Sequence, residues 1–429
     1  MKKKLLAVLL AMSLVGVTLL TGCGGSGGSS ESTKAAGGDK EGGKTIVYWS
    51  MWEATEPQAV VLQKAIDQYM KDTGNKVDVQ FKGRTGIREG LQPALDAGTT
   101  IDLFDEDIDR VNGTWGKYLM DLEELVKASD YEKTAMSSLI SACREVGDGT
   151  LKSIPYQPNV FAFFYNQELF DKAGIKELPT TWDEFLAVCE KLKAAGITPM
   201  TCDDAYIDCM FGYHMSRLLG EEGTQEVIKN GDWAENDAVL KTAEAYEELA
   251  SKGYFSKNIG SNVWPAGQNT ELATGKVAMY LNGSWLPNEV KGMTGDDFKW
   301  GCFSYPAVDG GKTGVEAANY GAQVFAINKD SKVSEEAFEL IKYFTKGEFD
   351  QQLSKESVGI PADTTNTEWP AMLECVKPVM DSLTTRYTWA AGAESDADMT
   401  PIIKENFIKL CAGKLTAKDF VATMEKASK

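Results

Sequence analysis

Residues 38–45 read GDKEGGKT and match the phosphate-binding loop pattern G-x-x-x-x-G-K-[ST] at every required position. Such a loop binds phosphate because backbone N–H groups between a strand and a helix converge on the anion. Here the segment from Gly24 to Gly43 contains no large apolar side chain, and the first strand-like run, Thr45–Trp49, follows the match instead of preceding it. We therefore interpret the match as a coincidence within a Gly/Ser-rich tether.

Candidate nucleophiles and metal ligands are few. The single histidine, His214, lies inside the apolar stretch MFGYHMSRLLG, which favours a structural role over catalysis. Of the eight cysteines, seven remain besides Cys23, and no C-x-x-C spacing occurs, so no metal or redox motif is indicated. We expect small buried thiols, with a local disulfide between Cys202 and Cys209 as the alternative.

Asp105, Asp107 and Asp109 have the alternating spacing of a calcium-binding loop. The position where such a loop needs a glycine for its sharp turn holds Arg110, and the position of its bidentate glutamate holds Gly116. We therefore expect no metal and no other cofactor.

Carboxylates are abundant, with 63 Asp and Glu against 44 Lys and Arg and a formal net charge of −19. Such a charge repels nucleic acid and anionic membrane surfaces, so neither is an expected partner. A glycoside hydrolase would use two carboxylates roughly 5 to 9.5 Å apart. With so many acids such pairs arise by chance, so a surface hydrolase is only a remote alternative.

The N-terminus has the layout of a secretory signal. Lys2–Lys4 precede an apolar run from Leu5 to Leu20, which is shorter than the roughly twenty residues of a membrane span. The following Leu20-Thr21-Gly22-Cys23 resembles a bacterial lipobox, in which the cysteine becomes the lipid-carrying N-terminus. We expect residues 1–22 to be a lipoprotein signal, Cys23 to be lipidated and residues 23–43 to form a flexible tether.

The rest of the chain alternates strand-like and helix-like segments. Strand signals at 46–49, 77–81, 101–104, 160–165 and 323–327 are separated by helical apolar spacing at 57–72, 87–97, 182–195 and 334–345. This alternation predicts an α/β fold with largely parallel sheets, because parallel strands are joined by crossover helices. Ligands of open α/β sheets bind beyond the carboxyl ends of the strands, so the functional residues should lie on those loops.

Three groups of residues carry a family resemblance. The first comprises Tyr165–Phe170, Pro179–Phe185 and Gly196–Pro199, the second comprises Gly275–Met279 and Asn282–Trp285, and the third comprises Ser334–Phe344 and Gly359–Pro361. In this order they resemble the signatures of family 1 extracellular solute-binding proteins, which include the maltose-binding protein and other sugar receptors of ABC importers. The likeness covers about residues 45–429.

The resemblance implies a two-lobed α/β clamshell of the type II periplasmic-binding-protein class, with three chain crossings near Pro158, Ala317 and Ala362. One lobe is then 44–157 with 318–362, and the other is 158–317 with 363–429. It also implies a receptor that captures a carbohydrate, expected to be an oligosaccharide, and passes it to the permease subunits of an ABC importer. With the lipobox, it predicts a monomer at the outer face of the cell membrane of a Gram-positive bacterium, attached to that membrane only through its N-terminal lipid.

The loops after the strand-like runs, together with the resemblance, predict the residues that contact the ligand. A sugar receptor needs aromatic rings for the C–H faces of the sugar and carboxylates, amides or Arg for its hydroxyls. The predicted contacts are Trp52, Glu53, Asp107, Asp109, Arg110, Asn159, Asp204, Tyr206, Trp264, Trp285, Tyr320 and Trp389.

Some of these residues also have a structural interpretation. Glu53 aligns with an acidic sugar ligand of the maltose receptor, but capping of the helix that begins near Pro57 is its alternative. Asp109-Arg110 matches a sugar-holding pair of that receptor, with a surface ion pair between the two residues as the rival. Asn159 stands where that receptor has a carboxylate, which suggests a different sugar.

The aromatic candidates differ in their alternatives. Trp285 is favoured as a stacking platform over a core residue, whereas Trp264 and Trp389 fit ligand stacking and core packing equally well. A non-sugar solute, such as a polyamine, a phosphate ester or a peptide, is the alternative ligand. A phosphate ester would need basic side chains at the strand ends, and only Arg110 and Arg386 qualify.

Overall fold

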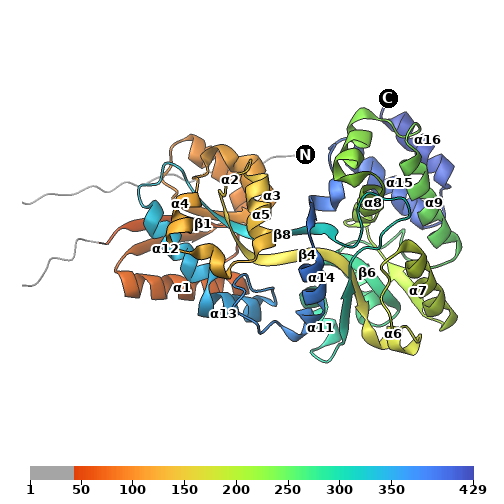
Figure 1. The fold of residues 1–429 in the computed structure, drawn as a ribbon, viewed down its shortest axis with the longest axis horizontal. Helices are drawn as coiled ribbons and strands as arrows, with labels where there is room; N and C mark the ends of the chain where they lie inside the picture. Colours follow the sequence, from red (N-terminus) through yellow and green to blue (C-terminus); the bar gives the residue numbers. More distant parts are fainter. Residues whose placement is uncertain (1–42) are drawn as a thin grey trace, which may run out of the picture. The chain divides into compact units, whose positions relative to one another are not determined.

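The computed structural model describes residues 43–429, which are shown in Figure 1. The predicted signal, the lipidation site Cys23 and the tether up to residue 42 lie outside these residues. Strand β1 (Thr45–Ser50) begins directly after Lys44. The GDKEGGKT match therefore ends where a strand begins, which is the reverse of the order that a phosphate-binding loop requires.

Nine strands form the sheet, in the order β2-β1-β3-β8-β4-β6-β5, with β7 beside β4 and β9 beside β8. After β1, they are β2 (Lys76–Phe81), β3 (Leu103–Asp107), β4 (Ile154–Asn166), β5 (Thr198–Thr201), β6 (Val277–Gly283), β7 (Trp300–Phe303), β8 (Ala317–Ile327) and β9 (Thr385–Tyr387).

The sheet is mixed, so the expectation of largely parallel sheets is wrong. β1 is parallel to β2 and β3, β5 is parallel to β6, and β8 is parallel to β9. The pairs β3–β8, β8–β4, β4–β6 and β4–β7 are antiparallel. The physical reason is that two long strands, β4 and β8, run in opposite directions through the middle of the sheet and form antiparallel ladders with most of their neighbours.

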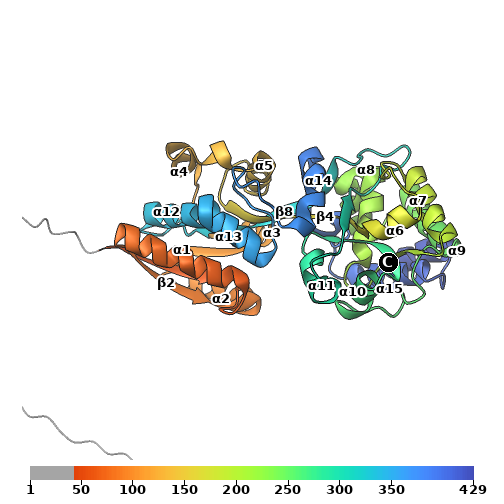
Figure 2. The same cartoon turned by 90° about the horizontal axis from the view of Figure 1, so that it is seen from below.

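The helices fall into two groups, one around each end of the strand order (Figures 1 and 2). The first lobe contains β1, β2 and β3 with α1 (Pro57–Thr73), α2 (Gly83–Asp96), α3 (Ile108–Trp115), η1 (Gly116–Tyr118), α4 (Glu123–Ala128), η2 (Tyr131–Thr134), α5 (Ser137–Val146), α12 (Ser334–Thr345) and α13 (Gly347–Ser357). The second lobe contains β5, β6 and β7 with α6 (Gln167–Lys172), α7 (Trp182–Ala194), α8 (Ile207–Asn230), α9 (Asp237–Ser251), α10 (Ala266–Ala273), α11 (Leu286–Thr294), η3 (Ala371–Val376), α14 (Lys377–Ser382), η4 (Trp389–Gly392), α15 (Met399–Cys411) and α16 (Ala417–Ala427). Within residues 43–429, none of these helices is both long enough and apolar enough to cross a bilayer.

Helix α1 follows directly from its sequence. Pro57 occupies its first turn, where the missing N–H is no loss. Residues Val61, Leu62, Ala65, Ile66 and Tyr69 recur at helical spacing and are all buried. Gly74 ends the helix in the left-handed region, with a φ of 75°. The helices predicted at 57–72, 182–195 and 334–345 are confirmed as α1, α7 and α12.

β4 and β8 join the two lobes. Along β4, residues 154–160 pair with β8, whereas residues 161–165 pair with β6. The register of the β4–β8 ladder shifts between Tyr156 and Pro158, and Gln157 there has a φ of 48°. β8 pairs with β9 at residues 317–319 and with β4 from residue 320 onward. These changes of partner lie near the crossings predicted at Pro158 and Ala317, and the exact lobe boundaries remain predictions.

Strand β3 is longer than the sequence suggested. The predicted strand ended at Phe104, but β3 continues to Asp107 because residues 103–107 form a regular antiparallel ladder with residues 327–323 of β8. Asp105 and Glu106 are consequently buried strand residues and not loop residues. A buried carboxylate is costly unless it is hydrogen-bonded, so both side chains need polar partners inside the fold.

Asp105 obtains its partners from three neighbouring segments. The Tyr48 hydroxyl of β1 donates to Asp105 at 2.8 Å, the backbone N–H of Met51 donates at 3.3 Å, and the Tyr156 hydroxyl of β4 donates to its other oxygen. Burial nevertheless raises the pKa of Asp105 to about 6, although the hydrogen bonds from Tyr156 and Tyr48 oppose this shift. One carboxylate thus links β1, β3 and β4 at the base of the first lobe.

We expect the Asp105→Asn variant to lose the pH dependence that Asp105 gives to folding stability. The Asp105 pKa is higher in the folded chain, at about 6, than its ordinary value of 3.8, so folding takes up a proton between these values. The contribution of Asp105 to the free energy of unfolding is therefore fully present below about pH 4 and falls by about 3 kcal/mol as the pH rises through 6, since one pKa unit is about 1.4 kcal/mol. Urea unfolding of both proteins from about pH 4 to pH 7 measures this contribution.

The matched control is Asp381→Asn, which alters an exposed carboxylate. Wild type and the Asp381 variant are unfolded under the same conditions for comparison. A difference in unfolding free energy between wild type and the Asp105 variant that stays constant with pH would contradict the raised pKa of Asp105.

Candidate functional site

Four aromatic side chains that the sequence assigns to the ligand lie together in the second lobe. Tyr206 precedes α8, Trp264 lies just before α10, Trp285 precedes α11 and Trp389 begins η4. β5 and β6 are parallel, so their carboxyl ends share one edge of the sheet. Tyr206 follows β5 and Trp285 follows β6, and this common edge brings the two side chains together.

Phe161 of β4 is the buried base of this group, and we call the five residues the aromatic cluster. The Phe161 ring centroid lies 5.7 Å from Tyr206, 6.1 Å from Trp285 and 5.8 Å from Trp389. Trp285 and Trp389 are nearly parallel, with centroids 6.4 Å apart and an interplanar angle of 23°. Trp264 meets Tyr206 edge-on at 6.5 Å and is 42% exposed. The aromatic cluster therefore combines buried rings with indoles that reach the surface.

Gly283 allows Trp285 to lie against the end of β6. A Cβ atom on Gly283 would come within 2.3 Å of three atoms of the Trp285 ring, so any larger residue would displace the indole. Trp285 is half-buried, since one side of it contacts the core. The Gly-x-Trp spacing of the sequence thus has a steric reason.

Carboxylates fix the loops around the aromatic cluster. The buried Asp203 accepts hydrogen bonds from the backbone N–H of Tyr206 at 3.0 Å and from the hydroxyl of Tyr280, which holds the start of α8. Burial raises the pKa of Asp203. The neighbouring Asp204 is exposed and accepts the backbone N–H of Trp264 at 3.0 Å. Asp204 therefore retains accessible oxygen lone pairs beside Trp264.

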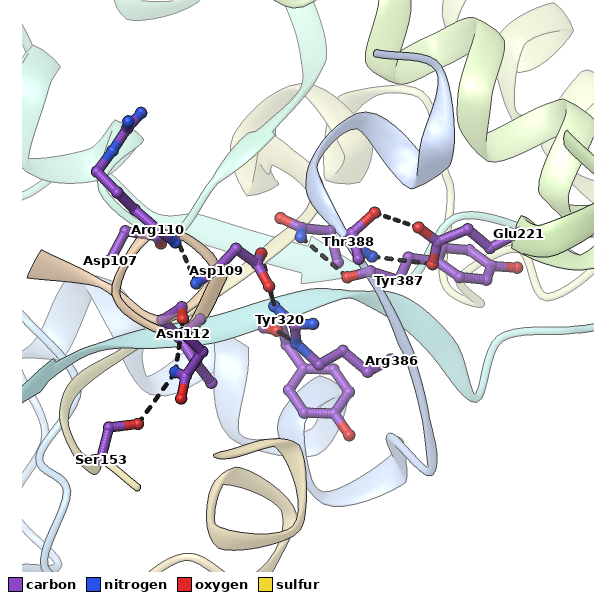
Figure 3. Close-up of polar contacts among 12 residues, drawn as sticks. Asp107, Asp109, Arg110, Asn112, Ser153, Glu221, Tyr320, Arg386, Tyr387 and Thr388 are labelled. Carbon is purple, nitrogen blue, oxygen red and sulfur yellow. Dashed lines mark hydrogen bonds and ion pairs between the residues drawn. The ribbon is translucent and has the colours of Figure 1, made fainter. Parts of the chain in front are cut away.

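A second group lies where the chain crosses between the lobes (Figure 3). It contains the predicted contacts Asp109 and Tyr320 together with Arg386, and we call these three residues the crossing group. Both carboxylate oxygens of Asp109, in α3, accept hydrogen bonds from Nη2 of Arg386 at 2.8 Å. The Nε of Arg386 donates to the carbonyl oxygen of Tyr320 at 2.8 Å. The Arg386 side chain is only 3% exposed. This arginine therefore ties α3 of the first lobe to β8 and β9.

Asn159 adjoins this crossing group. It pairs with Gly321 in the β4–β8 ladder, and a Cβ atom on Gly321 would lie 3.1 Å from Ile108 and 3.8 Å from Nη2 of Arg386. The half-buried Asn159 side chain makes no hydrogen bond to any other residue of the described range, so its amide is available to a ligand. Phe161 lies two residues further along the same face of β4, about 7 Å away. The crossing group and the aromatic cluster are therefore adjacent.

The rival interpretation of Asp109-Arg110 as an ion pair with each other is wrong. Asp109 pairs with Arg386, whereas Nε of Arg110 lies 2.9 Å from the buried carboxylate of Glu106. Arg88 binds the other oxygen of Glu106 at 2.6 Å. Glu106 is buried in strand β3 and contacts both arginines, because their positive charges offset the hydration that its carboxylate loses.

Asp107 caps helix α3. Its side chain accepts the backbone N–H of Asp109 at 2.9 Å and that of Arg110 at 3.4 Å, which satisfies donors that the first helical turn leaves free. Burial, and then the negative charge of Asp109, raises the pKa of Asp107 to about 6.

Trp52 and Glu53 follow β1 in the first lobe and have no ring or hydrogen-bond contact with the aromatic cluster. Trp52 is 4% exposed, its indole N–H donates to the Tyr156 hydroxyl at 2.7 Å, and the guanidinium of Arg84 lies 4.7 Å from its ring centroid. Glu53 is exposed and its carboxylate lies against Gly83. The capping alternative for Glu53 is wrong, because no side chain caps the start of α1.

Phe161 and the role of Arg386 were not predicted from the sequence. Phe161 had an available signal, since it lies two residues beyond Asn159 and hence on the same face of a strand. Arg386 pairs with Asp109 across 277 positions of the chain, so no local pattern could have joined them. Glu221 and Thr388 were also not predicted; they are hydrogen-bonded to each other (Figure 3), and Thr388 directly precedes Trp389 in the chain.

The histidine and the cysteines of the described residues lie inside the fold or are partly buried in it. His214 is buried and contacts the Tyr305 hydroxyl at 3.0 Å, and burial lowers its pKa to about 3, which confirms a structural histidine. All seven cysteines of this range are free, so the Cys202–Cys209 disulfide is wrong. No three His, Cys, Asp or Glu side chains of residues 43–429 are grouped to hold a metal ion.

A hollow of the described surface lies apart from both groups. It has a volume of about 430 Å³ and lies between the ends of α3 and α5, where Asn112, Lys117 and Lys152 contribute to its lining. It contains no aromatic side chain and none of the predicted contacts. We therefore base the functional site on the aromatic cluster and the crossing group.

Residues 53–348 match the family of bacterial extracellular solute-binding proteins, which is more than half of the chain. The diacetylchitobiose binding protein DasA of Streptomyces coelicolor is 27% identical over 94% of this chain and 90% of its own length. Binding proteins of Brucella abortus and Brucella suis are 25% identical over 50% of this chain, and the match spans about half, 52%, of those relatives.

Solved structures show the same fold. A probable secreted solute-binding lipoprotein from Streptomyces coelicolor superposes with a TM-score of 0.72, at 17% identity, over 91% of this chain and 99% of that chain. Proteins of this fold have the two-lobed architecture of type II solute-binding proteins, as predicted. The family consists of binding proteins and not of enzymes, which removes the hydrolase alternative. On the family match, the chain belongs to the bacterial extracellular solute-binding proteins.

Proposed function

We propose that this protein is a lipid-anchored receptor outside the cell that captures a carbohydrate between its lobes and delivers it to an ABC importer. The observation that carries the proposal is the aromatic cluster, in which three partly exposed tryptophans and Tyr206 gather over Phe161 next to the strand crossings. Indole faces cover the C–H faces of sugar rings, and carboxylates or amides beside them pair with hydroxyls.

The residues divide into two roles in this proposal. Direct ligand contacts are made by the exposed or half-buried side chains of Glu53, Asn159, Asp204, Trp264, Trp285 and Trp389, together with the buried ring of Tyr206 in the aromatic cluster. The other predicted residues have internal partners that place the loops of the site: Trp52, Asp107, Asp109, Arg110 and Tyr320. Arg386 is paired with Asp109, and Arg110 shares the Glu106 carboxylate with Arg88, so both arginines are already engaged with carboxylates and the balance favours a sugar over a phosphate ester.

The relatives point to an oligosaccharide. DasA, which matches nearly the whole chain, is named for binding diacetylchitobiose, a sugar of more than one ring. Several aromatic platforms in one site suit such a ligand, since each stacked ring covers one sugar unit. The lobes, with boundaries at 157/158, 317/318 and 362/363, would close around the ligand and present a distinct shape to the permease subunits.

The attachment to the membrane is inferred from the N-terminal sequence. The Leu20-Thr21-Gly22-Cys23 segment fits a lipobox, and the fold neighbour from Streptomyces coelicolor is described as a lipoprotein. A monomer anchored at Cys23 by a Gly/Ser-rich tether would remain at the outer face of a Gram-positive cell, which has no outer membrane to retain it.

We expect an oligosaccharide to raise the unfolding temperature of residues 44–429, and Trp285→Ala to abolish this rise. A ligand that binds only the folded state adds about 2.7 kcal/mol to the free energy of unfolding at 100 times its Kd. The variant removes the half-buried indole that contacts both Phe161 and Trp389. Thermal unfolding against a panel of mono- and oligosaccharides, including chitin-derived ones, measures the effect.

The control is Trp369→Ala, which removes another half-buried indole that contacts Lys377 at 5.3 Å and is not part of the aromatic cluster. This variant should keep the full ligand-induced rise. A rise with a polyamine, a phosphate ester or a peptide but with no carbohydrate would refute the sugar assignment and leave the receptor class intact.

We expect Cys23→Ser to release the full-length protein from the membrane into the medium of a Gram-positive host. Two or more acyl chains hold a protein stably at a bilayer, and without the thiol no lipid can be attached. Fractionation of cells and medium measures the distribution. Cys375→Ser, at the half-buried thiol, should stay with the membrane, and equal membrane retention of both variants would argue against the anchor.

A further inference from the structure

The segment that carries Trp389 has an unusual backbone. Ala390, Ala391 and Gly392 follow one another with φ values of 52°, 48° and 81°. Side chains of L-residues disfavour this left-handed region, and consecutive alanines in it persist only where the surroundings hold them. The conformation of residues 388–392, which we call the Trp389 loop, is therefore imposed by its contacts.

Helix α8 supplies most of these contacts. The Ser216 hydroxyl donates to the carbonyl oxygen of Ala391 at 2.8 Å. Gly212 lies so close to the Trp389 loop that a Cβ atom there would come within 1.8 Å of the carbonyl oxygen of Ala390. The first half of α8 thus offers a flat, small-residue surface on which the backbone of the loop rests.

Glu221 holds the beginning of the Trp389 loop with both carboxylate oxygens. One oxygen accepts the backbone N–H of Thr388 at 2.9 Å, and the other accepts the Thr388 hydroxyl (Figure 3). The Cγ of Glu221 also packs against Gly392, since a Cβ atom on Gly392 would lie 3.1 Å from it. Glu221 therefore contacts both ends of the loop, and its two charge-assisted hydrogen bonds fix the residue directly before Trp389.

A break in α8 accounts for the position of Glu221. Gly220 has φ 72° and ψ 165°, which no helical residue adopts, and the second half of α8 begins again at Glu221. A continuous helix would carry this side chain elsewhere on its surface, because residues advance by a fixed rotation along an α-helix. Gly220 and Glu221 together place a carboxylate at the start of the Trp389 loop.

We infer that Glu221 is a positioning residue for ligand recognition. Through its two hydrogen bonds to Thr388, it holds the Trp389 ring nearly parallel to Trp285. This inference rests on the proposed function, because it assigns Glu221 a role in the affinity of that same aromatic cluster. The site then includes Glu221, although this side chain contacts none of the rings of the aromatic cluster. The geometry concerned is the 6.4 Å separation between the two indoles, to which the interaction of the Trp389 side chain with Glu394 also contributes.

The test compares Glu221→Ala with Glu222→Ala in the chain 44–429. Glu222 is the next residue of the same helix, is exposed and has no hydrogen bond or ion pair with the described residues, so it matches the loss of charge and side chain. The first readout needs no ligand: the transition dipoles of two indoles 6.4 Å apart couple, and where these dipoles are skewed the coupling gives an exciton couplet in the far-ultraviolet circular dichroism spectrum whose sign and size depend on their relative orientation. The part of the spectrum lost in Trp389→Phe identifies that couplet.

Glu221→Ala should lose the couplet and bind the sugar found in the thermal panel at least about ten-fold more weakly, whereas Glu222→Ala should keep both. Glu221→Gln should retain most of the couplet and bind within about three-fold of wild type, because its amide oxygen still accepts the Thr388 N–H and its N–H donates to the Thr388 hydroxyl. The Gln variant loses the same charge as the Ala variant, so a difference between them reports geometry and not electrostatics.

The inference is overturned if Glu221→Ala keeps the wild-type couplet, or if Glu221→Gln loses couplet and affinity as completely as Glu221→Ala. Should Glu221→Ala not fold, the comparison of Glu221→Gln with Thr388→Val, which removes the hydroxyl partner, decides by the same readouts. If the wild-type protein binds no carbohydrate, the proposed function fails, and the couplet alone still decides whether Glu221 positions Trp389.

Discussion

The hydrogen-bonded ladder between β4 and β8 runs through the middle of the sheet, and the parts of the site are attached to it on both sides. Asn159 and Phe161 belong to β4, and Tyr320 belongs to β8. β6, which leads to Trp285, pairs with β4, and β9, which leads to Trp389, pairs with β8. The relative positions of the two platforms are thus set by strand register, because a slip of one residue would turn each side chain to the opposite face.

Buried or half-buried carboxylates hold the loops that this ladder positions. Asp203 binds the start of α8, Glu221 binds Thr388, and Asp350 accepts the backbone N–H groups of Ala362 and Asp363 at 2.8 and 3.1 Å. Glu271 accepts hydrogen bonds from four side chains, namely Thr201, Ser256, Asn258 and Asn262. Each carboxylate obtains several donors from loop backbone or short polar side chains, which replaces the hydration it loses. Several acidic residues of this strongly acidic chain therefore hold its loops in place through hydrogen bonds, while others lie on its surface and favour solubility.

The sequence was a good guide to elements with strong local signals and a weaker guide to their extent. The helices predicted at 57–72, 182–195 and 334–345 were found nearly to the residue, because apolar spacing and end signals such as Pro57 and Gly74 are local. The helix predicted at 87–97 is α2, which begins earlier, at Gly83, and ends at Asp96. The end of β3 was missed because Asp105–Asp107 look like loop residues until the tyrosines and arginines that pair with them are in place. The antiparallel ladders of β4 and β8 were missed for a related reason: strand direction depends on partners more than 100 positions away.

The same division applies to the candidate site. Tyr206, Trp264, Trp285 and Trp389 were each proposed as ligand contacts from the sequence and its family resemblance, and the structure brings them together, whereas the pairing of Asp109 with Arg386 was not predicted. Chain neighbours such as Asp109 and Arg110 suggest a pair to a reader of the sequence, but α3 directs them to different partners. Local patterns therefore identified which side chains converge, and long-range contacts decided which of them remain available to a ligand.

The place of β9 in the chain has a consequence for the order in which the site is assembled. A chain emerging from its N-terminus presents Phe161, Tyr206 and Trp285 well before the segment 385–389, which must return to the edge of β8 and close a loop of more than 100 residues from Trp285. Such a closure is entropically unfavourable until the final contacts form, so it belongs to the slow, late stage of folding. A chain that ends before β9 would retain Trp285 but lack Trp389, so the pair of indoles could not form. The paired arrangement of the two indoles is therefore reached only when β9 has joined β8.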